Sequence, residues 1–208
     1  MMRTPAKLAC LTTSALLFAA LVAGVLFGLS DGFDTAIRSA VNGWATPELT
    51  SAFSAITWIG AGEVVYALTA VVTVALLAIG RRSDALYLLA VMAAAFLINN
   101  AVKYSVARAR PEAFFGETPT TYSFASGHAL YASCFYAVVG ALIAGQLPGA
   151  WPRAVLLLGV LALVGAIGLS RVYLGVHYPT DVLAGFALAA LILCVARGLA
   201  TERQNAQT

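Results

Sequence analysis

Six apolar stretches, each long enough to cross a lipid bilayer as a helix, limit how this chain can fold. They lie near residues 8–29, 62–80, 84–103, 127–146, 153–170 and 179–197. A spanning helix needs about 20 mostly apolar residues, and backbone inside hydrocarbon must satisfy its own hydrogen bonds. The sequence therefore predicts an all-α integral membrane protein, a bundle of six transmembrane helices.

The composition agrees with a single membrane domain. Of the 208 residues, 61% are hydrophobic and only 10% are charged, whereas soluble domains carry about a quarter charged residues. We expect one domain over residues 1–208, because the helices must bury their polar faces against one another. The net charge of +3 comes without basic runs interleaved with aromatic residues, which argues against nucleic acid as a partner.

The first 60 residues allow two further predictions. The apolar run 8–29 follows Arg3 and Lys7, but it is longer than the roughly 7–15 residues of a signal-peptide core, which favours a retained first span. The segment 31–60, with "DGFD" and Pro47, is too broken for a clean span. We expect it to form a helix that lies at the outer interface or packs on the bundle.

The three cysteines, Cys10, Cys134 and Cys194, all lie inside apolar stretches. Their positions show neither a disulfide pattern nor metal-ligand spacing. We therefore expect them to be unpaired small residues that face lipid or the bundle core.

Basic residues near the ends of the spans indicate the orientation, because cytoplasmic loops carry an excess of them. With the N-terminus inside, the cytoplasmic side has seven: Arg3, Lys7, Arg81, Arg82, Arg153, Arg197 and Arg203. The outer side then has five: Arg38, Lys103, Arg108, Arg110 and Arg171. Four of these five lie in the polar segments described next, so we expect an inner-membrane protein whose polar segments face the outside.

Three polar segments interrupt the apolar chain, and the six-span topology puts all of them on one side. The first, "KYSVARARP" at 103–111, closes the third span. A helix that continues to Arg110 would put Lys103 and Arg110 on one face, about 10 Å apart along the axis, where both can reach one anion. The alternative is that they are cations that reach the interface from a helix end.

The second polar segment, "YSFASGHAL" at 122–130, opens the fourth span. Ser126 is a suitable N-cap residue, and Gly127 allows a ligand to approach the backbone closely. The N-terminus of this helix is therefore a candidate anion site. The alternative is a plain capped helix with His128 at the interface.

The third polar segment, "SRVYLGVHYPTD" at 170–181, leads into the sixth span. Pro179 suits the first helical position, so Asp181 falls in the first turn and can bond back to His177. Such a carboxylate fixes the tautomer of an imidazole and stabilises its charged form. Arg171 offers a fork of donors that suits phosphate oxygens, or it forms a structural ion pair with Asp181.

Together the three segments contain the cations Lys103, Arg110 and Arg171, a helix N-terminus and both histidines of the chain. This set matches a phosphate group, which carries a charge of about −1.5 to −2 near neutral pH. The sequence has no second cluster of carboxylates to hold Mg²⁺ or Zn²⁺. We therefore expect phosphoryl chemistry without a metal or another cofactor.

The segments resemble the signature of the type 2 phosphatidic acid phosphatase superfamily, which includes membrane lipid phosphatases, glucose-6-phosphatase and vanadium haloperoxidases. The pattern is Lys, six residues, Arg-Pro; then Pro-Ser-Gly-His; then Ser-Arg, five residues, His, three residues, Asp. It is matched here by Lys103, Arg110, Pro111, Ser126, Gly127, His128, Ser170, Arg171, His177 and Asp181. Ala125 replaces the Pro of the second motif. We expect this replacement to affect the rigidity of the loop more than the chemistry of the site.

The resemblance implies a role for each matched residue. His177 would be the nucleophile that forms a phosphohistidine, and Asp181 would orient it. His128 would protonate the leaving alkoxide and later activate water. The phosphoryl oxygens would be held by Lys103, Arg110, Ser126, Gly127 and Arg171.

The sequence thus predicts a metal-independent lipid phosphatase embedded in membrane lipids. Candidate substrates are isoprenyl diphosphates, phosphatidic acid, phosphatidylglycerophosphate and lipid A phosphates. Two alternatives stay open. The first is a phosphotransferase that passes the phosphoryl group to a lipid acceptor. The second is a non-catalytic lipid-binding membrane subunit.

Overall fold

The computed structural model describes residues 4–205, and this range contains helices and loops but no strand. Arg3, which the orientation argument uses, lies outside the described residues. In chain order the helices are α1 (Thr4–Leu26), α2 (Asp31–Asn42), α3 (Pro47–Trp58), α4 (Gly62–Ala78), α5 (Arg82–Val106), α6 (Gly127–Ala144), α7 (Ala150–Tyr173) and α8 (Pro179–Asn205).

The long helices are those expected of a membrane-spanning bundle. Within the described residues, α1, α5, α6, α7 and α8 are long and apolar enough to cross a membrane. Helices α3 and α4 pass the same test together, as a pair bent by 44°. The all-helical membrane architecture is therefore confirmed, and the count of six spans holds when this bent pair is taken as one.

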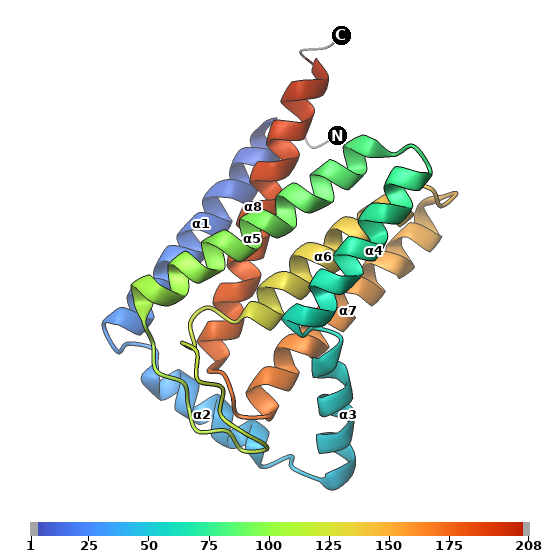
Figure 1. The fold of residues 1–208 in the computed structure, drawn as a ribbon. Helices are drawn as coiled ribbons and strands as arrows, with labels where there is room; N and C mark the ends of the chain where they lie inside the picture. The colour runs from blue at the N-terminus through green and yellow to red at the C-terminus, as the bar shows by residue number, and fades with distance from the viewer. Residues whose placement is uncertain (1–3, 206–208) are drawn as a thin grey trace.

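Helix α6 lies at the centre of the bundle, where it contacts α4, α5, α7 and α8 (Figure 1). Helix α1 packs along α8, and the start of α1 and the end of α8 lie at the same end of the molecule. At the opposite end, α3 packs on α7, and α2 lies across the bundle against α7 and α8. The segment 31–60 therefore forms two helices packed on the bundle, one of the two arrangements that the sequence allows.

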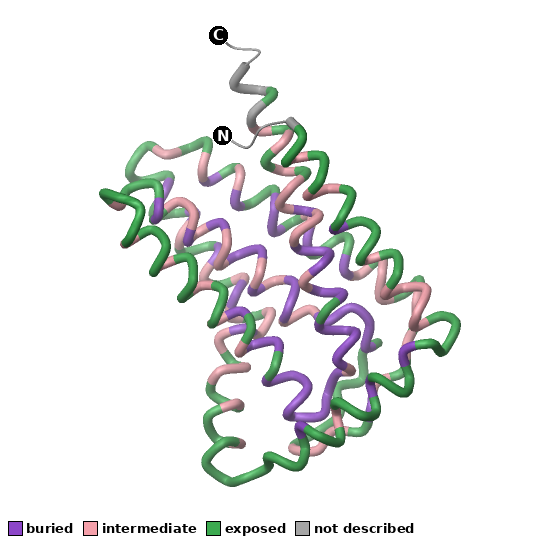
Figure 2. Tube along the Cα trace, turned by 180° about the vertical axis from the view of Figure 1, so that it is seen from behind, coloured by how far each residue is buried: buried purple, intermediate pink, exposed green. Residues whose placement is uncertain are grey.

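Burial follows the pattern that a lipid environment requires. The buried residues follow the inner faces of the helices and gather at the end where α8 begins (Figure 2). Leu88, Met92 and Leu130 are completely buried between α5 and α6, whereas Leu158 and Leu161 on α7 are exposed. Apolar side chains on the outer surface suit contact with acyl chains, and packing rather than exclusion from water holds such helices together.

A close approach of two backbones fixes the end of the bundle that carries the polar segments. A Cβ atom on Gly185 of α8 would lie 2.8 Å from the carbonyl oxygen of Ser126 and 2.9 Å from the Cβ of Ala129. Only glycine leaves room for this contact, as is typical of small residues at membrane helix interfaces. The first turn of α6 and the second turn of α8 therefore lie directly against each other.

The expectation that all three cysteines are unpaired is wrong for two of them. A disulfide joins Cys10 on α1 to Cys194 on α8, while Cys134 is free and buried. The two partners are 184 residues apart in sequence, and they meet because the first and last helices pack side by side. Sequence spacing carries no sign of such a pairing.

Candidate active site

The three polar segments come together at the end of the bundle where α5 and α7 finish and α6 and α8 begin (Figure 1). The loop 107–126 crosses this end and connects α5 to α6. Its Ser123 approaches His177 and Asp181, and its Arg110 also reaches His177. The expectation that the three segments share one side of the bundle therefore agrees with the geometry.

Helix α5 does not continue to Arg110, so the condition under which the sequence would place Lys103 and Arg110 on one helix face is not met. It ends at Val106, and Ala107 adopts a left-handed conformation with φ of 46° while its N–H donates to the carbonyl oxygen of Lys103. Such a left-handed residue is a common helix terminator, and a residue that precedes proline, as Arg110 does, avoids the helical region. Lys103 and Arg110 therefore reach the site from a helix end and from an extended loop.

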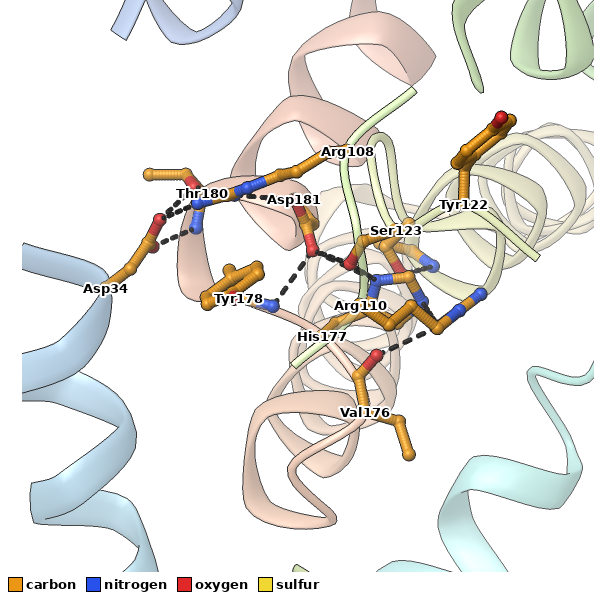
Figure 3. Close-up of polar contacts among 12 residues, drawn as sticks. Asp34, Arg108, Arg110, Tyr122, Ser123, Val176, His177, Tyr178, Thr180 and Asp181 are labelled. Carbon is orange, nitrogen blue, oxygen red and sulfur yellow. Dashed lines mark hydrogen bonds and ion pairs between the residues drawn. The ribbon is translucent and has the colours of Figure 1, made fainter. Parts of the chain in front are cut away.

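The centre of the site is the buried pair of His177 and Asp181 (Figure 3). His177 Nδ1 lies 3.2 Å from Asp181 Oδ2, and the two residues are 1% and 0% exposed. Helix α8 begins at Pro179, so Asp181 occupies the first turn as predicted. The same oxygen, Oδ2, also accepts hydrogen bonds from the Ser123 hydroxyl and from the backbone N–H of Tyr178.

The hydrogen bonds define which tautomer His177 adopts. Its Nε2 lies 3.0 Å from Nη1 of Arg110, and a guanidinium can only donate. Nε2 must therefore be the acceptor, so the ring proton sits on Nδ1, where it faces Asp181. Burial lowers the pKa of His177 from 6.5 to about 3, although Asp181 acts in the opposite direction. The imidazole is neutral near pH 7, with its lone pair on Nε2.

Three of the predicted cations, Lys103, Arg110 and Arg171, lie at the site around His177 and His128. Lys103 Nζ donates to the carbonyl oxygen of Tyr122 at 2.5 Å, and Arg110 Nη1 donates to that of Val176 at 2.8 Å. Burial lowers the pKa of Arg110 from its ordinary value, and Asp181 opposes this shift. The cations are therefore held chiefly by neutral oxygens, which leaves their charge available to an anion.

Arg171 has the least satisfied guanidinium of the three. Its Nη1 donates to the Thr57 hydroxyl at 2.6 Å, while its buried Nε finds no hydrogen-bond partner among residues 4–205. The alternative of an Arg171–Asp181 ion pair does not occur among the described side chains, because Asp181 pairs with Arg108 instead, at 2.8 Å. Arg171 thus keeps both a charge and a donor free for a ligand.

The start of α6 supplies the remaining predicted residues. Ser126 is the N-cap, and its hydroxyl accepts from the N–H of Ala129, as predicted. A Cβ on Gly127 would lie 3.1 Å from the Tyr131 ring, so this position is tight. Half-buried His128 interacts electrostatically with Arg171, His177, Arg110 and Lys103. Ala125 is buried, and the Phe124–Ala125 peptide bond is cis.

Four residues at the site were missed by sequence reasoning. Arg108 forms ion pairs with Asp181 and with Asp34 of α2, and Thr180 donates to Asp34. Ser123 bonds to the Asp181 carboxylate. The charges of "DGFD" and Arg108 were visible in the sequence, but no spacing rule connects residues about 70 positions apart. Only the packing of α2 across the end of the bundle brings them together.

Within residues 4–205, no group of three or more His, Cys, Asp or Glu side chains lies close enough to hold a metal ion. The polar groups that line the site are instead the cations and hydroxyls described above.

A membrane helix bundle with a carboxylate-oriented histidine among cations defines a class of membrane protein that handles phosphate groups. Comparison with known families identifies the class more closely, because the model of the PAP2 superfamily matches residues 84–204. This match covers more than half of the chain, including α6, α7, nearly all of α5 and α8, and all three polar segments. The chain belongs to the PAP2 superfamily, which confirms the resemblance seen in the sequence.

Known relatives support the same assignment. Phosphatidylglycerophosphatase B of Bacillus subtilis is 31% identical, over 88% of this chain and 91% of the relative. An undecaprenyl-diphosphatase of Sulfolobus acidocaldarius is 36% identical, over 47% of this chain and 46% of the relative. The crystal structure of a transmembrane PAP2 type phosphatidylglycerolphosphate phosphatase from Bacillus subtilis superimposes with a TM-score of 0.83 and 28% identity, covering 92% of this chain and 96% of that one. The fold and the phosphatase class are therefore confirmed.

The lowered pKa of His177 leads to a prediction about titration. The NMR signal of the His177 ring should not shift between pH 5 and 8, because its pKa of about 3 keeps the ring unprotonated there. Between about pH 3 and 6.5 the unfolded chain binds the additional proton, so this group makes the free energy of unfolding rise with pH. The measurement uses labelled histidine in detergent, with His128→Asn to assign the two signals; a midpoint near 6.5 for His177 would contradict the geometry.

Proposed function

We propose that the protein is a multi-pass lipid phosphatase that hydrolyses a phosphate monoester or diphosphate of a membrane lipid through a phosphohistidine at His177. The observation that carries the proposal is the state of this side chain. It is buried and neutral, its Nδ1–H faces Asp181, and its Nε2 lone pair faces Arg110. An unprotonated nitrogen oriented by a carboxylate and placed beside cations is an activated nucleophile for a phosphoryl group. The whole chain acts as one domain in this proposal.

In the first step, Nε2 of His177 attacks phosphorus, and the bond from phosphorus to the lipid oxygen breaks. His128 gives a proton to the leaving alkoxide, as general acid. The imidazole gains positive charge as the P–N bond forms, and the Asp181 carboxylate stabilises that charge through the Nδ1 proton. The dephosphorylated lipid then leaves the site.

In the second step, water attacks the phosphohistidine and gives a proton to His128. The P–N bond breaks, its electrons return to Nε2, and inorganic phosphate departs. His177 is again neutral, so each cycle consumes one water per phosphate released.

Charge stabilisation comes from the residues that surround the nucleophile. Lys103, Arg110 and Arg171 neutralise the phosphoryl oxygens, and the N-terminus of α6 adds the Ser126 hydroxyl and the backbone N–H of Gly127 as donors. Phosphoryl transfer depends mainly on positioning and on stabilising charge over these oxygens. Because Arg110 contacts Nε2, the atom that attacks phosphorus in this proposal, we expect its guanidinium to move onto a phosphate oxygen when substrate binds.

The substrate class follows from the place of the site at the end of spanning helices, where a lipid phosphate group meets water. The relatives named as phosphatidylglycerophosphatase and undecaprenyl-diphosphatase favour a phospholipid or isoprenyl phosphate, and phosphatidic acid and lipid A phosphates carry the same chemical group. Relatives named as phosphatases also favour an enzyme over a non-catalytic subunit. Transfer to a lipid acceptor instead of water would appear as turnover without release of inorganic phosphate.

We further infer that the site faces the outside of the inner membrane. Arg81 and Arg82, next to the start of α5, and Arg153, in the first turn of α7, lie at the end of the bundle opposite the site. Basic residues mark cytoplasmic ends.

Orientation can be measured by labelling single cysteines, in a background in which Cys10, Cys134 and Cys194 are replaced. Glu117→Cys, exposed in the loop at the site, should react with an impermeant reagent in intact cells. Ala150→Cys, exposed at the other end of the bundle, should react only after the inner face is opened. The reverse pattern would overturn the proposed orientation.

The roles of the two histidines predict different substrate dependence. His177→Ala should abolish turnover of every substrate, because the covalent intermediate cannot form. His128→Ala should lose about 10²–10⁴-fold on a lipid monoester, whose alkoxide needs a proton, but much less on an aryl phosphate with an acidic phenol. The measurement is kcat for both substrates. Equal losses for both variants on both substrates would mean that the roles are wrongly assigned.

A further inference from the structure

Arg108 connects the site to α2 through two buried carboxylates. Its Nη1 lies 2.8 Å from Asp181 Oδ1, and its Nη2 lies 2.7 Å from Asp34 Oδ2 (Figure 3). The Arg108 side chain is 11% exposed, and those of Asp34 and Asp181 are 1% and 0% exposed. One guanidinium therefore compensates two buried negative charges on different helices.

We propose that Arg108 is a positioning residue for phosphoryl transfer, which holds the Asp181 carboxylate, and through it the His177 imidazole, in the reactive orientation. Asp34 of α2 serves as its anchor. This inference rests on the proposed function, because it assigns a partner to the residue that orients the nucleophile. It adds to the site a residue that lies between the matched positions Lys103 and Arg110.

The hydrogen bonds of Asp181 support this role. Its Oδ2 accepts from Ser123 and Tyr178 and faces His177, whereas its Oδ1 accepts from Arg108. A carboxylate that is bonded at both oxygens cannot rotate about its last bond. In metal sites, groups that orient the ligands through hydrogen bonds in this way are likewise required for full activity.

Further contacts fix the position of the Arg108 side chain, so that it can hold Asp181 in one orientation. Nη1 also donates to the Thr180 hydroxyl at 2.9 Å, and the Tyr178 ring lies 3.8 Å from the guanidinium carbon. The backbone carbonyl of Arg108 accepts from the N–H of Ser123 at 2.9 Å. The residue therefore supports Asp181 directly through its side chain and indirectly through Ser123.

The same contacts give Arg108 an electrostatic effect on His177. Besides Asp181 from α8, the groups that face His177 are Ser123 and Arg110 from the loop, Arg171 from α7 and His128 from α6. Without Arg108, the charge of Asp181 is less compensated and favours protonation of the imidazole. The acid limb of the kcat/KM profile should then move to higher pH, which a purely structural role would not cause.

The experiment compares Arg108→Gln with Arg38→Gln as a matched control. Arg38 also fastens α2 to the loops, through the carbonyl oxygens of Glu112 and Gly175, but it makes no hydrogen bond to Asp181. For folded protein acting on a lipid phosphate, Arg108→Gln should lower kcat about 10–100-fold and leave KM within about twofold. It should also move the acid limb of the kcat/KM profile to higher pH. Arg38→Gln should keep kcat near the wild-type value, even if its melting temperature falls.

Wild-type kcat in folded Arg108→Gln, or a loss no greater than that of Arg38→Gln, would overturn the inference, as would a loss confined to KM. If Arg108→Gln does not fold, Arg108→Lys decides, because one ammonium group cannot hold both carboxylates with a planar fork. A kcat loss of about tenfold at constant KM then supports the inference, and wild-type kcat overturns it.

Asp181→Asn separates the two proposals. If that variant is fully active, the proposed function fails, whereas an inactive Asp181→Asn beside a normal Arg108→Gln rejects only the role of Arg108.

Discussion

The buried carboxylate of Asp181 is the group on which the rest of the site depends. A charge without solvent is costly unless it is paired and hydrogen-bonded, and Asp181 meets this condition with partners from separate parts of the chain. The loop 107–126 supplies Ser123 and Arg108, the segment before α8 supplies Tyr178 and His177, and Arg108 brings in Asp34 of α2. A backbone hydrogen bond adds a further link, in which the carbonyl of Asp181 accepts from the N–H of Ser126. One residue thus aligns His177, the N-cap of α6 and, through Arg108, helix α2.

The bundle makes this arrangement possible by keeping polar groups at one end. The non-helical loop 107–126 bonds back to the chain at several points, for example from the N–H of Phe114 to the carbonyl of Leu174. Backbone groups near the membrane need such partners. The close contact at Gly185 brings α8 against α6, which places His177 and the N-terminus of α6 around one space. Lys103, Arg110 and Arg171 are held there by carbonyl and hydroxyl oxygens, which leaves their charge available to an anion.

Much of the fold and of the candidate site could be predicted from the sequence, because both depend on local signals. Length and apolarity located the spans, and the Ser126 cap and the Asp181 turn follow from helix-terminus preferences. The prediction failed where packing decides. Helix α5 ends before Arg110 through a left-handed Ala107, and Cys10 meets Cys194 only because α1 packs on α8. Asp34 and Arg108 form their ion pair across 74 positions, a separation that no motif spacing encodes.

The central claim is that this site hydrolyses a lipid phosphate with side-chain cations in place of a metal ion. The most direct measurement is release of inorganic phosphate by the purified protein in EDTA, from phosphatidylglycerophosphate, phosphatidic acid, an isoprenyl diphosphate and lipid A. We predict release from at least one of these lipids at a rate that EDTA does not change and that His177→Ala abolishes. No release from any of them, or release that EDTA abolishes and Mg²⁺ restores, would contradict the account.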